Sequence, residues 1–557
     1  MIFQEGEAYS LFDNPDFLGA WDLLWEKCPW ATVFQHKDFV ITWYNNYLSF
    51  KPLVLSDWNG KTMSFLFTLS LKKTNLISAA GSDQAEYQTW LSKPDTYENY
   101  VHQNILDLKV KFPNHRIHLK YLPSQTPLTW LRNSETLMGC YFLKEHQQPM
   151  ILLDKVLLEG ELKKKNRKEK LNRLRRLGNL QFFQISSIEE FEKVIDEMIL
   201  QSDLRKGAIY GKMIFQDEPN RRNFLLKMFE LGHLHVSVLK LDETIIASNA
   251  GFMGKDVVHL QGINSHSPFF SKYSPGILHF LMLGIHLSEV EKKYFDLTPG
   301  GIDGYKSMLA NKTETVYELW ISSQRVIFPL LIKENFKKWV LTLSEKSGFI
   351  SAAVSAYQDK FKGRKSGINW KRIFPNNGSY LNELDSRGDK IYFILDSLLE
   401  SPDLKSGSIS VRKNLIADLF LLEESGKKFS KRDFFSDSLR RIELGNQLIS
   451  VIWEGKLLAA FWDISESRKL NDKFPSNGNI HKKIIICCSY FDCRISNQLM
   501  PKFHQLILEL FVGVKDDNQL ILEVGHKQKQ LIRLLYNWKV KPFIFERNIS
   551  NFVKKSQ

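Results

Sequence analysis

The chain has 557 residues, a hydrophobic fraction of 43% and a formal net charge of +14 at pH 7, values that predict several globular cores and permit anionic partners. No apolar run of about 18 residues is free of charge, so we expect no membrane-spanning helix. The first residues lack the basic and apolar regions of a signal peptide, and none is expected. The five cysteines lack the spacing of a metal site, so we expect reduced thiols, a cytoplasmic location and no metal.

The first block, residues 1–150, begins with helical patterns. Apolar and aromatic residues recur at three- and four-residue spacing from Phe17 to Trp25 and again from Phe39 to Tyr47, which predicts two helices. Two apolar runs flank Asn59-Gly60 and predict a β-hairpin, because this dipeptide favours a tight turn. The block therefore combines helices with a small sheet.

The second block, residues 151–325, places its elements in the order of an α+β fold. Helices are expected at 189–200 and 223–231, after a basic segment. The elements expected next are strands 235–239, 245–252 and 257–263, helix 275–290, and strands 294–297 and 315–320. An antiparallel meander followed by a helix and further strands predicts a mixed central sheet.

The third block, residues 385–557, follows a helical connector and linker at 326–384 and repeats this element order. The expected elements are a hairpin at 447–453 and 457–462, strand 483–489, helix 499–511, strand 520–525 and helix 529–538. The site that corresponds to Ser274-Pro275-Gly276 is Arg494–Asn497, which lacks glycine. We therefore interpret the third block as an inactive structural copy of the second.

The start of helix 275–290 has the residues of an anion site. Ser274 is expected to cap the helix with its hydroxyl, and Pro275 suits the first helical position. Gly276 has no side chain, so a ligand could approach the backbone closely. Unpaired N–H groups at the start of a helix attract phosphate, although an ordinary capped helix has the same residues.

Polar residues on the neighbouring strands are candidates for the same site. Asp296 ends a short strand before a Pro-Gly-Gly turn, where its carboxyl could accept the proton of an acceptor group or could only cap the turn. His259 and Gln261 lie two residues apart, so they share one strand face and could line a cleft, although a strand histidine is often structural.

The basic segment 163–176 has helical spacing. A solvated helix face is one interpretation, and contact with donor phosphates or an anionic acceptor is the other. Nucleic acid is not expected, because the run lacks interleaved aromatic residues.

Several short motifs follow one another in order between residues 15 and 322. They are Cys28–Gln35, Asp83–Tyr87, the basic stretch that ends at Gly178, Ala247–Phe252, Ser274-Pro275-Gly276, Phe295–Leu297 and Gly304-Tyr305-Lys306. In this order and spacing they resemble the CelD-type, FemAB-like branch of the GNAT acyltransferase superfamily. The resemblance implies tandem GNAT-like domains, with a degenerate half in residues 1–150 and the acyl-donor site in residues 151–325. With a third, degenerate GNAT-like block, the expected fold class is α+β with mixed central sheets.

The resemblance also implies roles for further residues. In GNAT chemistry a tyrosine hydroxyl can protonate the leaving thiolate, and Tyr305 is the candidate here. Lys306 could hold a phosphate or an acceptor anion. Asp83 and Tyr87 are candidates for an acceptor cleft between the two halves. The alternative for all four is structural: a packed tyrosine, a solvated lysine and a polar loop.

The implied activity is acyl transfer to an amine or hydroxyl, in pathways such as polysaccharide or cell-envelope biosynthesis. Classical members carry a Gln/Arg-x-x-Gly-x-Gly/Ala loop, and Tyr273–Gly276 replaces it here, so the donor stays open between acyl-CoA (acetyl-CoA in its simplest form) and another activated acyl group. We expect a small-molecule or glycan acceptor. One alternative is a FemX-like transferase that uses aminoacyl-tRNA and grips the RNA with the basic segment. Another is a non-catalytic scaffold.

Overall fold

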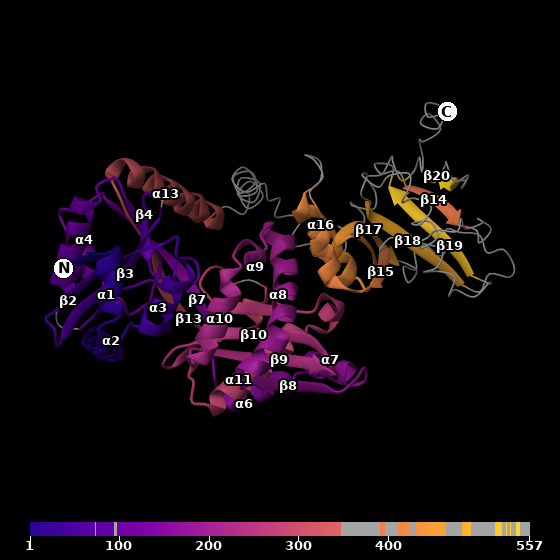
Figure 1. The fold of residues 1–557 in the computed structure, drawn as a ribbon, viewed down its shortest axis with the longest axis horizontal. Coiled ribbons are helices and arrows are strands. Elements are labelled where there is room, and N and C mark those ends of the chain that lie inside the picture. The colour runs from indigo at the N-terminus through magenta and orange to yellow at the C-terminus, as the bar shows by residue number, and fades with distance from the viewer. Residues whose placement is uncertain are drawn as a thin grey trace. The chain divides into compact units, whose positions relative to one another are not determined.

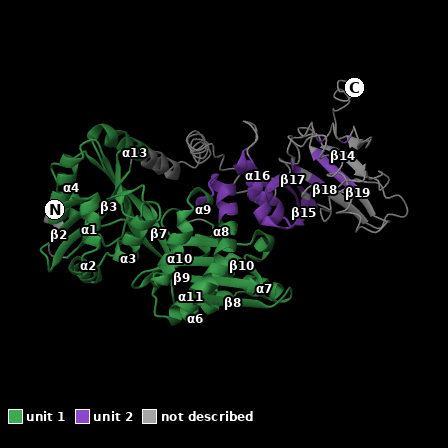
Figure 2. Ribbon diagram, viewed as in Figure 1, with its two compact units in different colours: residues 1–202, 215–356 green, residues 203–214, 357–557 purple. Residues whose placement is uncertain are grey.

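A computed structural model describes residues 1–72, 74–93, 97–302, 304–346, 390–395, 409–423, 430–463, 482–491, 518–525, 531, 535 and 542–545 of the chain. The chain divides into two compact units. Unit 1 contains residues 1–202 and 215–356, and unit 2 contains residues 203–214 and 357–557 (Figure 2). The sequence-predicted helices 499–511 and 529–538 and the segment Arg494–Asn497 lie outside the described residues, apart from residues 531 and 535.

The first part of unit 1 packs helices against strands (Figure 1). Its elements are β1 (Ile2–Gln4), α1 (Glu5–Phe12), α2 (Pro15–Lys27), η1 (Val33–Gln35), α3 (Lys37–Asn46), β2 (Lys51–Trp58), β3 (Met63–Lys72), β4 (Leu76–Ala79), β5 (Leu91–Ser92), α4 (Tyr97–Lys111), β6 (Arg116–Leu122), α5 (Thr129–Arg132) and β7 (Tyr141–Leu152). The expected helices at Phe17–Trp25 and Phe39–Tyr47 are confirmed as α2 and α3, and the Asn59-Gly60 turn joins β2 to β3. Buried aromatic residues such as Trp21, Trp43 and Phe65 fill this core.

The second part of unit 1 follows the expected order closely; residues 203–214, which include the end of α8, are counted with unit 2. Its elements are α6 (Lys155–Lys163), α7 (Lys165–Arg175), β8 (Leu180–Ile185), α8 (Ile188–Tyr210), α9 (Ile214–Asp217), α10 (Asn220–Glu230), β9 (Leu234–Leu241), β10 (Thr244–Met253), β11 (Val257–His266), η2 (Pro268–Tyr273), α11 (Pro275–Glu289), β12 (Tyr294–Asp296), α12 (Tyr305–Leu309), β13 (Lys312–Ile321) and α13 (Gln324–Lys346). The basic segment is helical, but it breaks at Lys164 into the end of α6 and the whole of α7.

One 13-stranded sheet runs through unit 1 in the order β1-β2-β3-β4-β6-β13-β7-β12-β11-β10-β9-β8, with β5 paired to β3. The last strand, β13, is not at an edge, because it lies between β6 and β7 and pairs with both. Strands from both parts of unit 1 therefore alternate at the centre of the sheet. This interleaving joins the two parts by backbone hydrogen bonds.

The same topology occurs three times among the described strands. A three-stranded antiparallel meander is followed by a strand that pairs in parallel with the third strand of the meander. We call these copy 1 (β2, β3, β4 and β6), copy 2 (β9, β10, β11 and β12) and copy 3 in unit 2. The strands of copy 3 are β16 (Gln447–Trp453), β17 (Lys456–Asp463), β18 (Lys482–Phe491) and β19 (Asn518–Gly525).

Unit 2 has a seven-stranded sheet in the order β15-β16-β17-β18-β19-β14-β20. Its remaining described elements are β14 (Lys390–Leu395), β15 (Ile409–Lys413), η4 (Ile416–Leu421), α16 (Lys431–Glu443) and β20 (Pro542–Phe545). The hairpin expected at 447–462 is confirmed as β16 and β17. The expected combination of helices with mixed central sheets is therefore confirmed.

The sheet of copy 2 is covered on both faces. Helix α11 packs Phe280, Leu281 and Leu283 on one face, which we call the helix face, against side chains of β7, β11 and β12. On the opposite face the rings of Phe34, Phe39 and Phe224 surround Phe252 of β10, and we call this the aromatic face. None of the helices in the described part of the chain combines the length and apolar run that a bilayer crossing requires.

Candidate functional site

Strands β11 and β12 pair over a short distance and then diverge. Their parallel register covers three residues and ends at His259 opposite Asp296. Beyond that pair β11 continues to His266 along β10. The chain after β12 follows β7 instead, because Leu297 N donates to Pro149 O at 3.0 Å and Gly300 N donates to Gln147 O at 3.1 Å. The two strands therefore part at the His259–Asp296 pair.

Three of the predicted site residues meet at this point. Asp296 Oδ2 accepts a hydrogen bond from the Tyr87 hydroxyl at 2.6 Å and contacts His259 Nδ1 at 2.9 Å. Asp296 Oδ1 accepts from Thr298 N at 2.9 Å, so the carboxyl also caps the turn that follows. Asp296 is 0% exposed, Tyr87 1% and His259 3%. Among the described residues, the hydrogen bonds of the carboxyl therefore join it to Tyr87, His259 and the turn.

Segments from the first part of unit 1 hold this group in place. The Phe34 ring packs against the His259 ring at 5.2 Å between centroids. Gln35 Nε2 donates to Tyr87 O at 2.8 Å, which fixes the loop that carries Tyr87. Burial first, and then the Asp296 carboxyl, raise the pKa of Tyr87 well above its ordinary value. The hydroxyl therefore stays protonated and able to donate at neutral pH.

Helix α11 begins at Pro275 as predicted, but the predicted capping by the Ser274 hydroxyl is wrong. Ser274 has a left-handed backbone (φ 52°) and its side chain forms no cap. Its hydroxyl instead accepts a hydrogen bond from Lys170 Nζ of α7 at 2.8 Å. A Cβ on Gly276 would lie 3.4 Å from His266 Nδ1, an ordinary contact. The helix start therefore lies between a lysine and a histidine, and the charge of Lys170 adds to the positive N-terminal end of the helix dipole.

The remaining candidates lie around the turn after β12 and the loop after Gly81. Lys306 Nζ donates to Thr298 O at 2.9 Å and contacts Thr298 Oγ1 at 3.2 Å. The half-buried Tyr305 ring stacks on Phe280 of α11 at 5.8 Å. Gln261 Nε2 donates to the backbone oxygen of the exposed Asp83 at 3.0 Å, which ties the Tyr87 loop to β11. The structure thus joins Asp83 to Gln261 and Lys306 to the turn that Asp296 caps.

A polar group that the sequence did not indicate lies on the helix face of copy 2. His235, Ser237, Asn249 and His279 are buried there, and Ser237 Oγ hydrogen-bonds His279 Nε2 at 3.1 Å. Burial lowers the pKa of His235 and of His279 to about 3. Both imidazoles are therefore neutral at physiological pH, and they lie beneath α11. A histidine in an apolar strand is the only signal that sequence offers for such a residue.

A second unpredicted polar group spans the central strands. Glu318 of β13 contacts His118 Nε2 of β6 at 3.1 Å and His146 Nε2 of β7 at 3.0 Å. These hydrogen bonds, together with one from Trp320, lower the pKa of Glu318 despite its partial burial. The pairing of β13 with β6 and β7 creates this group. Sequence could not have indicated it, because the three strands are distant in the chain.

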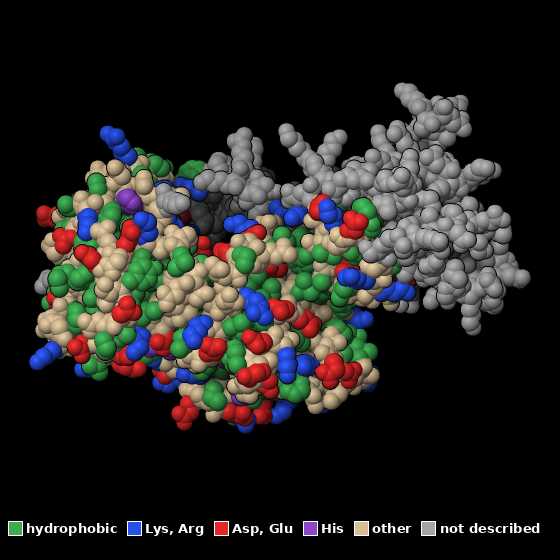
Figure 3. Space-filling view, viewed as in Figure 1, with side chains coloured by type: hydrophobic (Ala, Val, Ile, Leu, Met, Phe, Trp, Pro, Cys, Tyr) green, Lys and Arg blue, Asp and Glu red, His purple; other side chains and the backbone are tan. Residues whose placement is uncertain are grey.

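The basic surface is less concentrated than the sequence suggests. Within α6 and α7, Lys163, Lys164 and Arg173 each pair with a glutamate of the same region. The face of unit 1 seen in Figure 3 carries Lys and Arg side chains interspersed with Asp and Glu. Lys170 is distinctive among these residues because it contacts the start of α11.

Comparisons with known proteins give a family match for part of the chain. Residues 163–307 match the acetyltransferase (GNAT) domain family. The chain is similar to the FemX structure at 10% identity and a TM-score of 0.40, covering 56% of this chain and 98% of that chain. It is similar to the C-terminal domain of a putative lysylphosphatidylglycerol synthetase from Agrobacterium fabrum at 14% identity and a TM-score of 0.39, covering 58% and 95%. The L-PGS structure from Bacillus licheniformis matches at 10% identity and a TM-score of 0.38, covering 58% and 96%.

None of the curated proteins matches the chain. The matched segment 163–307 begins in the basic helices and ends in α12, so it contains β9 to β12, α11 and the site residues Ser274, Gly276 and Asp296. Residues 163–307 of this chain therefore carry a GNAT-type acetyltransferase domain.

Proposed function

We propose that the chain is an acyltransferase of the CelD-type, FemAB-like kind that moves an acyl group from acyl-CoA to an amine or hydroxyl. The observation that carries the proposal is the divergence of β11 and β12 at a buried Tyr87–Asp296–His259 group, within a segment that matches the acetyltransferase family. The proposal keeps the sequence-based domain limits (1–150, 151–325, 326–384 and 385–557), a cytoplasmic location and a role in polysaccharide or cell-envelope synthesis.

The start of α11 would bind the diphosphate of the donor. A helix N-terminus presents N–H groups and a positive dipole end to an anion. Lys170 Nζ donates a hydrogen bond to Ser274 Oγ at 2.8 Å. When a donor is bound, this ammonium group would pair with its phosphate instead. The pantetheine arm would follow β11 beyond His259, on the side that β12 leaves. Lys306 beside Thr298 would hold a phosphate or the acceptor on the other side of the gap.

The buried group would handle the proton of the acceptor. With Nδ1–H directed to Asp296, His259 presents the lone pair of Nε2, and Asp296 keeps the ring in that tautomer. The acceptor amine or hydroxyl would lose its proton to His259, to Asp296 through Tyr87, or to water. Its N or O would form a bond to the thioester carbonyl carbon as the C–S bond breaks. The sulfur would leave as a thiolate and take a proton from Tyr305 or from water, and positioning would supply much of the rate.

Calorimetric titration with acetyl-CoA tests the donor site. The wild-type chain should bind acetyl-CoA, and Gly276→Glu should abolish binding because it places a carboxylate where the diphosphate would lie. Gly19→Glu is the matched control, because Gly19 lies on helix α2 with open space around its Cβ position. Equal binding by wild type and Gly276→Glu would remove the α11 start from the proposal.

A second candidate is the FemX-like use of aminoacyl-tRNA, which the basic face of α7 favours. Lys165, Lys168, Arg175 and Arg176 add to the charges near Lys170. RNA binding through such residues weakens steeply with salt. Titration of the chain with a tRNA mixture at low and at high salt tests this candidate. An affinity for tRNA that falls with salt would support it, whereas no binding, or binding that does not depend on salt, would exclude it. The scaffold alternative is tested by measuring thiol release from acetyl-CoA. If the wild type releases thiol and Asp296→Asn does not, the scaffold alternative is excluded.

A further inference from the structure

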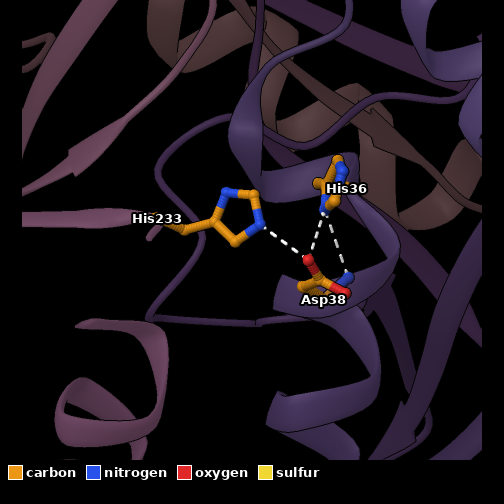
Figure 4. A group of neighbouring side chains, drawn as sticks. All are labelled: His36, Asp38 and His233. Atoms are coloured by element: carbon orange, nitrogen blue, oxygen red, sulfur yellow. Dashed lines mark hydrogen bonds and ion pairs between the residues drawn. The ribbon is translucent and has the colours of Figure 1, made fainter. Parts of the chain in front are cut away.

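Three side chains from two segments converge on one point at the junction of the two parts of unit 1 (Figure 4). His36 precedes α3, Asp38 lies in the first turn of α3, and His233 lies in the turn between α10 and β9. One ligand atom from each lies within 4.8 Å of the other two. Each of the three is partly exposed, so an ion could reach the group from solvent.

The geometry at Asp38 is close to that of a metal site. Asp38 Oδ2 is 2.7 Å from His233 Nε2 and 3.5 Å from His36 Nδ1. Ligand atoms around a tetrahedral zinc ion lie about 2.0–2.2 Å from the ion and therefore roughly 3.4 Å from one another. Two imidazole nitrogens and one carboxylate oxygen are a donor set that zinc accepts, with water in the fourth position. Small movements of these side chains would place all three around one ion.

His36 presents a lone pair to the carboxylate. Its Nδ1 accepts a hydrogen bond from Asp38 N at 3.3 Å as the cap of α3, so in this arrangement the nitrogen carries no proton, and a bound ion would take its one lone pair from that N–H. The same atom faces Asp38 Oδ2, which is also an acceptor. Two acceptors that face each other repel unless a positive species lies between them. A divalent cation between His36 and Asp38 would remove this repulsion.

The carboxyl of Asp22, which also pairs with Lys37, lies on the outer side of His36, where metal-bound histidines usually have a carboxylate partner. His36 Nε2 lies 4.0 Å from Asp22 Oδ1, and that oxygen is a buried atom with no hydrogen-bond partner within the described residues. A carboxylate on the second nitrogen orients a ligating imidazole and makes it a stronger donor. The edge of the Trp25 ring lies against the His36 ring at 4.8 Å and fixes its plane. The orphan oxygen of Asp22 is an observation independent of the three ligands.

We propose that His36, Asp38 and His233 bind a divalent transition metal ion, zinc by preference, that clamps α3 to the turn before β9. On binding, the hydrogen between His233 Nε2 and Asp38 leaves that position, either to solvent or by a change of tautomer, and both atoms bind the ion. The clamp lies directly after η1, whose Phe34 and Gln35 hold His259 and the Tyr87 loop. The ion would therefore brace the segment that supports the candidate site, and it takes no part in the acyl transfer.

The test uses the full-length chain after treatment with a chelator. Calorimetric titration with zinc chloride should show one equivalent bound to the wild type, and the melting temperature should rise. His36→Asn is the sharpest variant, because Asn retains the capping of α3 and removes the imidazole. His36→Asn and His233→Asn should each weaken binding at least about tenfold, the scale known for lesser changes around metal ligands. Cobalt chloride should give the visible absorption of a tetrahedral site with the wild type alone.

The matched control is His146→Asn. His146 also contacts a carboxylate, that of Glu318, which a second histidine, His118, contacts as well. It is outside the group of residues that could hold an ion. This variant should bind zinc as the wild type does. If His233→Asn fails to fold by circular dichroism, His36→Asn decides the question. No zinc uptake by the wild type, or equal uptake by His36→Asn, would overturn the proposal and leave an ordinary His–Asp contact.

Discussion

The three copies differ most at one position, the last residue pair of the parallel register. Copy 1 has Ile77 opposite Ile117, a buried apolar pair. Copy 2 has His259 opposite Asp296, which Tyr87 completes. Copy 3 has Cys487 opposite Glu523, where burial raises the pKa of the Cys487 thiol to about 12. The same arrangement of strands thus holds an apolar pair, a hydrogen-bonded polar pair and a pair whose thiol stays protonated.

This comparison teaches that topology creates the position and the side chains decide its chemistry. A thiol with a raised pKa stays protonated and is a poor nucleophile, and two isoleucines offer no proton transfer. The copies also differ in regularity. Between the second and third meander strands, copy 2 has a bulge between Gly251 and Phe252 and copy 3 has one between Ala460 and Phe461, whereas copy 1 has a continuous register from Leu69 to Lys72. Bulges bend strands and accompany functional sites.

The largest effect is expected for Asp296→Asn in copy 2. The amide has no negative charge, and when its oxygen faces Tyr87 and His259 its NH₂ group faces the N–H of Thr298, so thiol release from acetyl-CoA should fall by roughly 10²–10⁴-fold. Binding of acetyl-CoA should stay within error of wild type, because the α11 start is unchanged. Glu523→Gln, the equivalent change in copy 3, should leave the rate unchanged. A loss of rate in Glu523→Gln would break the distinction between the copies.

Next in size is the stability cost of Gly262→Ala. Gly262 lies beside the bulge of copy 2 with φ 144°, and a Cβ there would be 2.1 Å from Ala250 O. The substitution should lower the free energy of unfolding by about 2–4 kcal/mol, through backbone strain and displacement of β10. Chemical denaturation monitored by tryptophan fluorescence measures this value. Gly19→Ala, in an open helical position, should be neutral or slightly stabilising.

A pH dependence of stability should arise from the helix face of copy 2. The meander strands of copies 1 and 3 contain no histidine, whereas His235 is in β9 and packs near His279. Their pKa values of about 3 lie below the ordinary value near 6.5, so the unfolded chain binds more protons between these limits. The stability that the two neutral imidazoles contribute is fully present above pH 6.5 and is lost as the pH falls toward 3.

The free energy of unfolding should change with pH by as much as about 1.4 kcal/mol per pH unit for each of these two histidines. Melting temperatures across this pH range should decline less in His279→Gln than in wild type. His115→Gln, a half-buried histidine of copy 1, should leave the slope as it is. Identical slopes for His279→Gln and wild type would show that burial beneath α11 is not the cause.

The smallest effect is expected for Tyr87→Phe. The ring still packs on His259 at 5.2 Å, and only one hydrogen bond to Asp296 is lost. Thiol release should fall by about tenfold. Tyr44→Phe removes another buried hydroxyl, which donates to Leu69 O, and should change stability without changing the rate. An equal rate loss in both variants would mean that the effect is structural.

Local patterns were enough to predict most of copy 2. The alternation in β9 to β11, the proline at the start of α11 and the short apolar run before Asp296 all depend on neighbours in sequence. Asp296, His259 and Tyr87 were each predicted singly, but their meeting was not. Tyr87 and Asp296 are 209 residues apart, and only the packing of the two parts of unit 1 joins them.

The remaining features depend on contacts between distant residues. The place of β13 between β6 and β7 follows from strand pairing, and it alone creates the contacts of Glu318 with His118 and His146. The predicted capping by Ser274 failed because its backbone is left-handed, with φ 52°, and its hydroxyl accepts from Lys170 instead. The helix propensity of the local sequence predicts neither the contact with Lys170 nor the left-handed backbone of Ser274.

The central claim is that one of the three copies binds the donor. The most direct measurement is the number of acetyl-CoA molecules that the full-length chain binds in a calorimetric titration. The account predicts one per chain in the wild type and in Glu523→Gln, and none in Gly276→Glu. Two per chain, or a single site that survives Gly276→Glu and disappears in Glu523→Gln, would contradict the assignment of the site to copy 2.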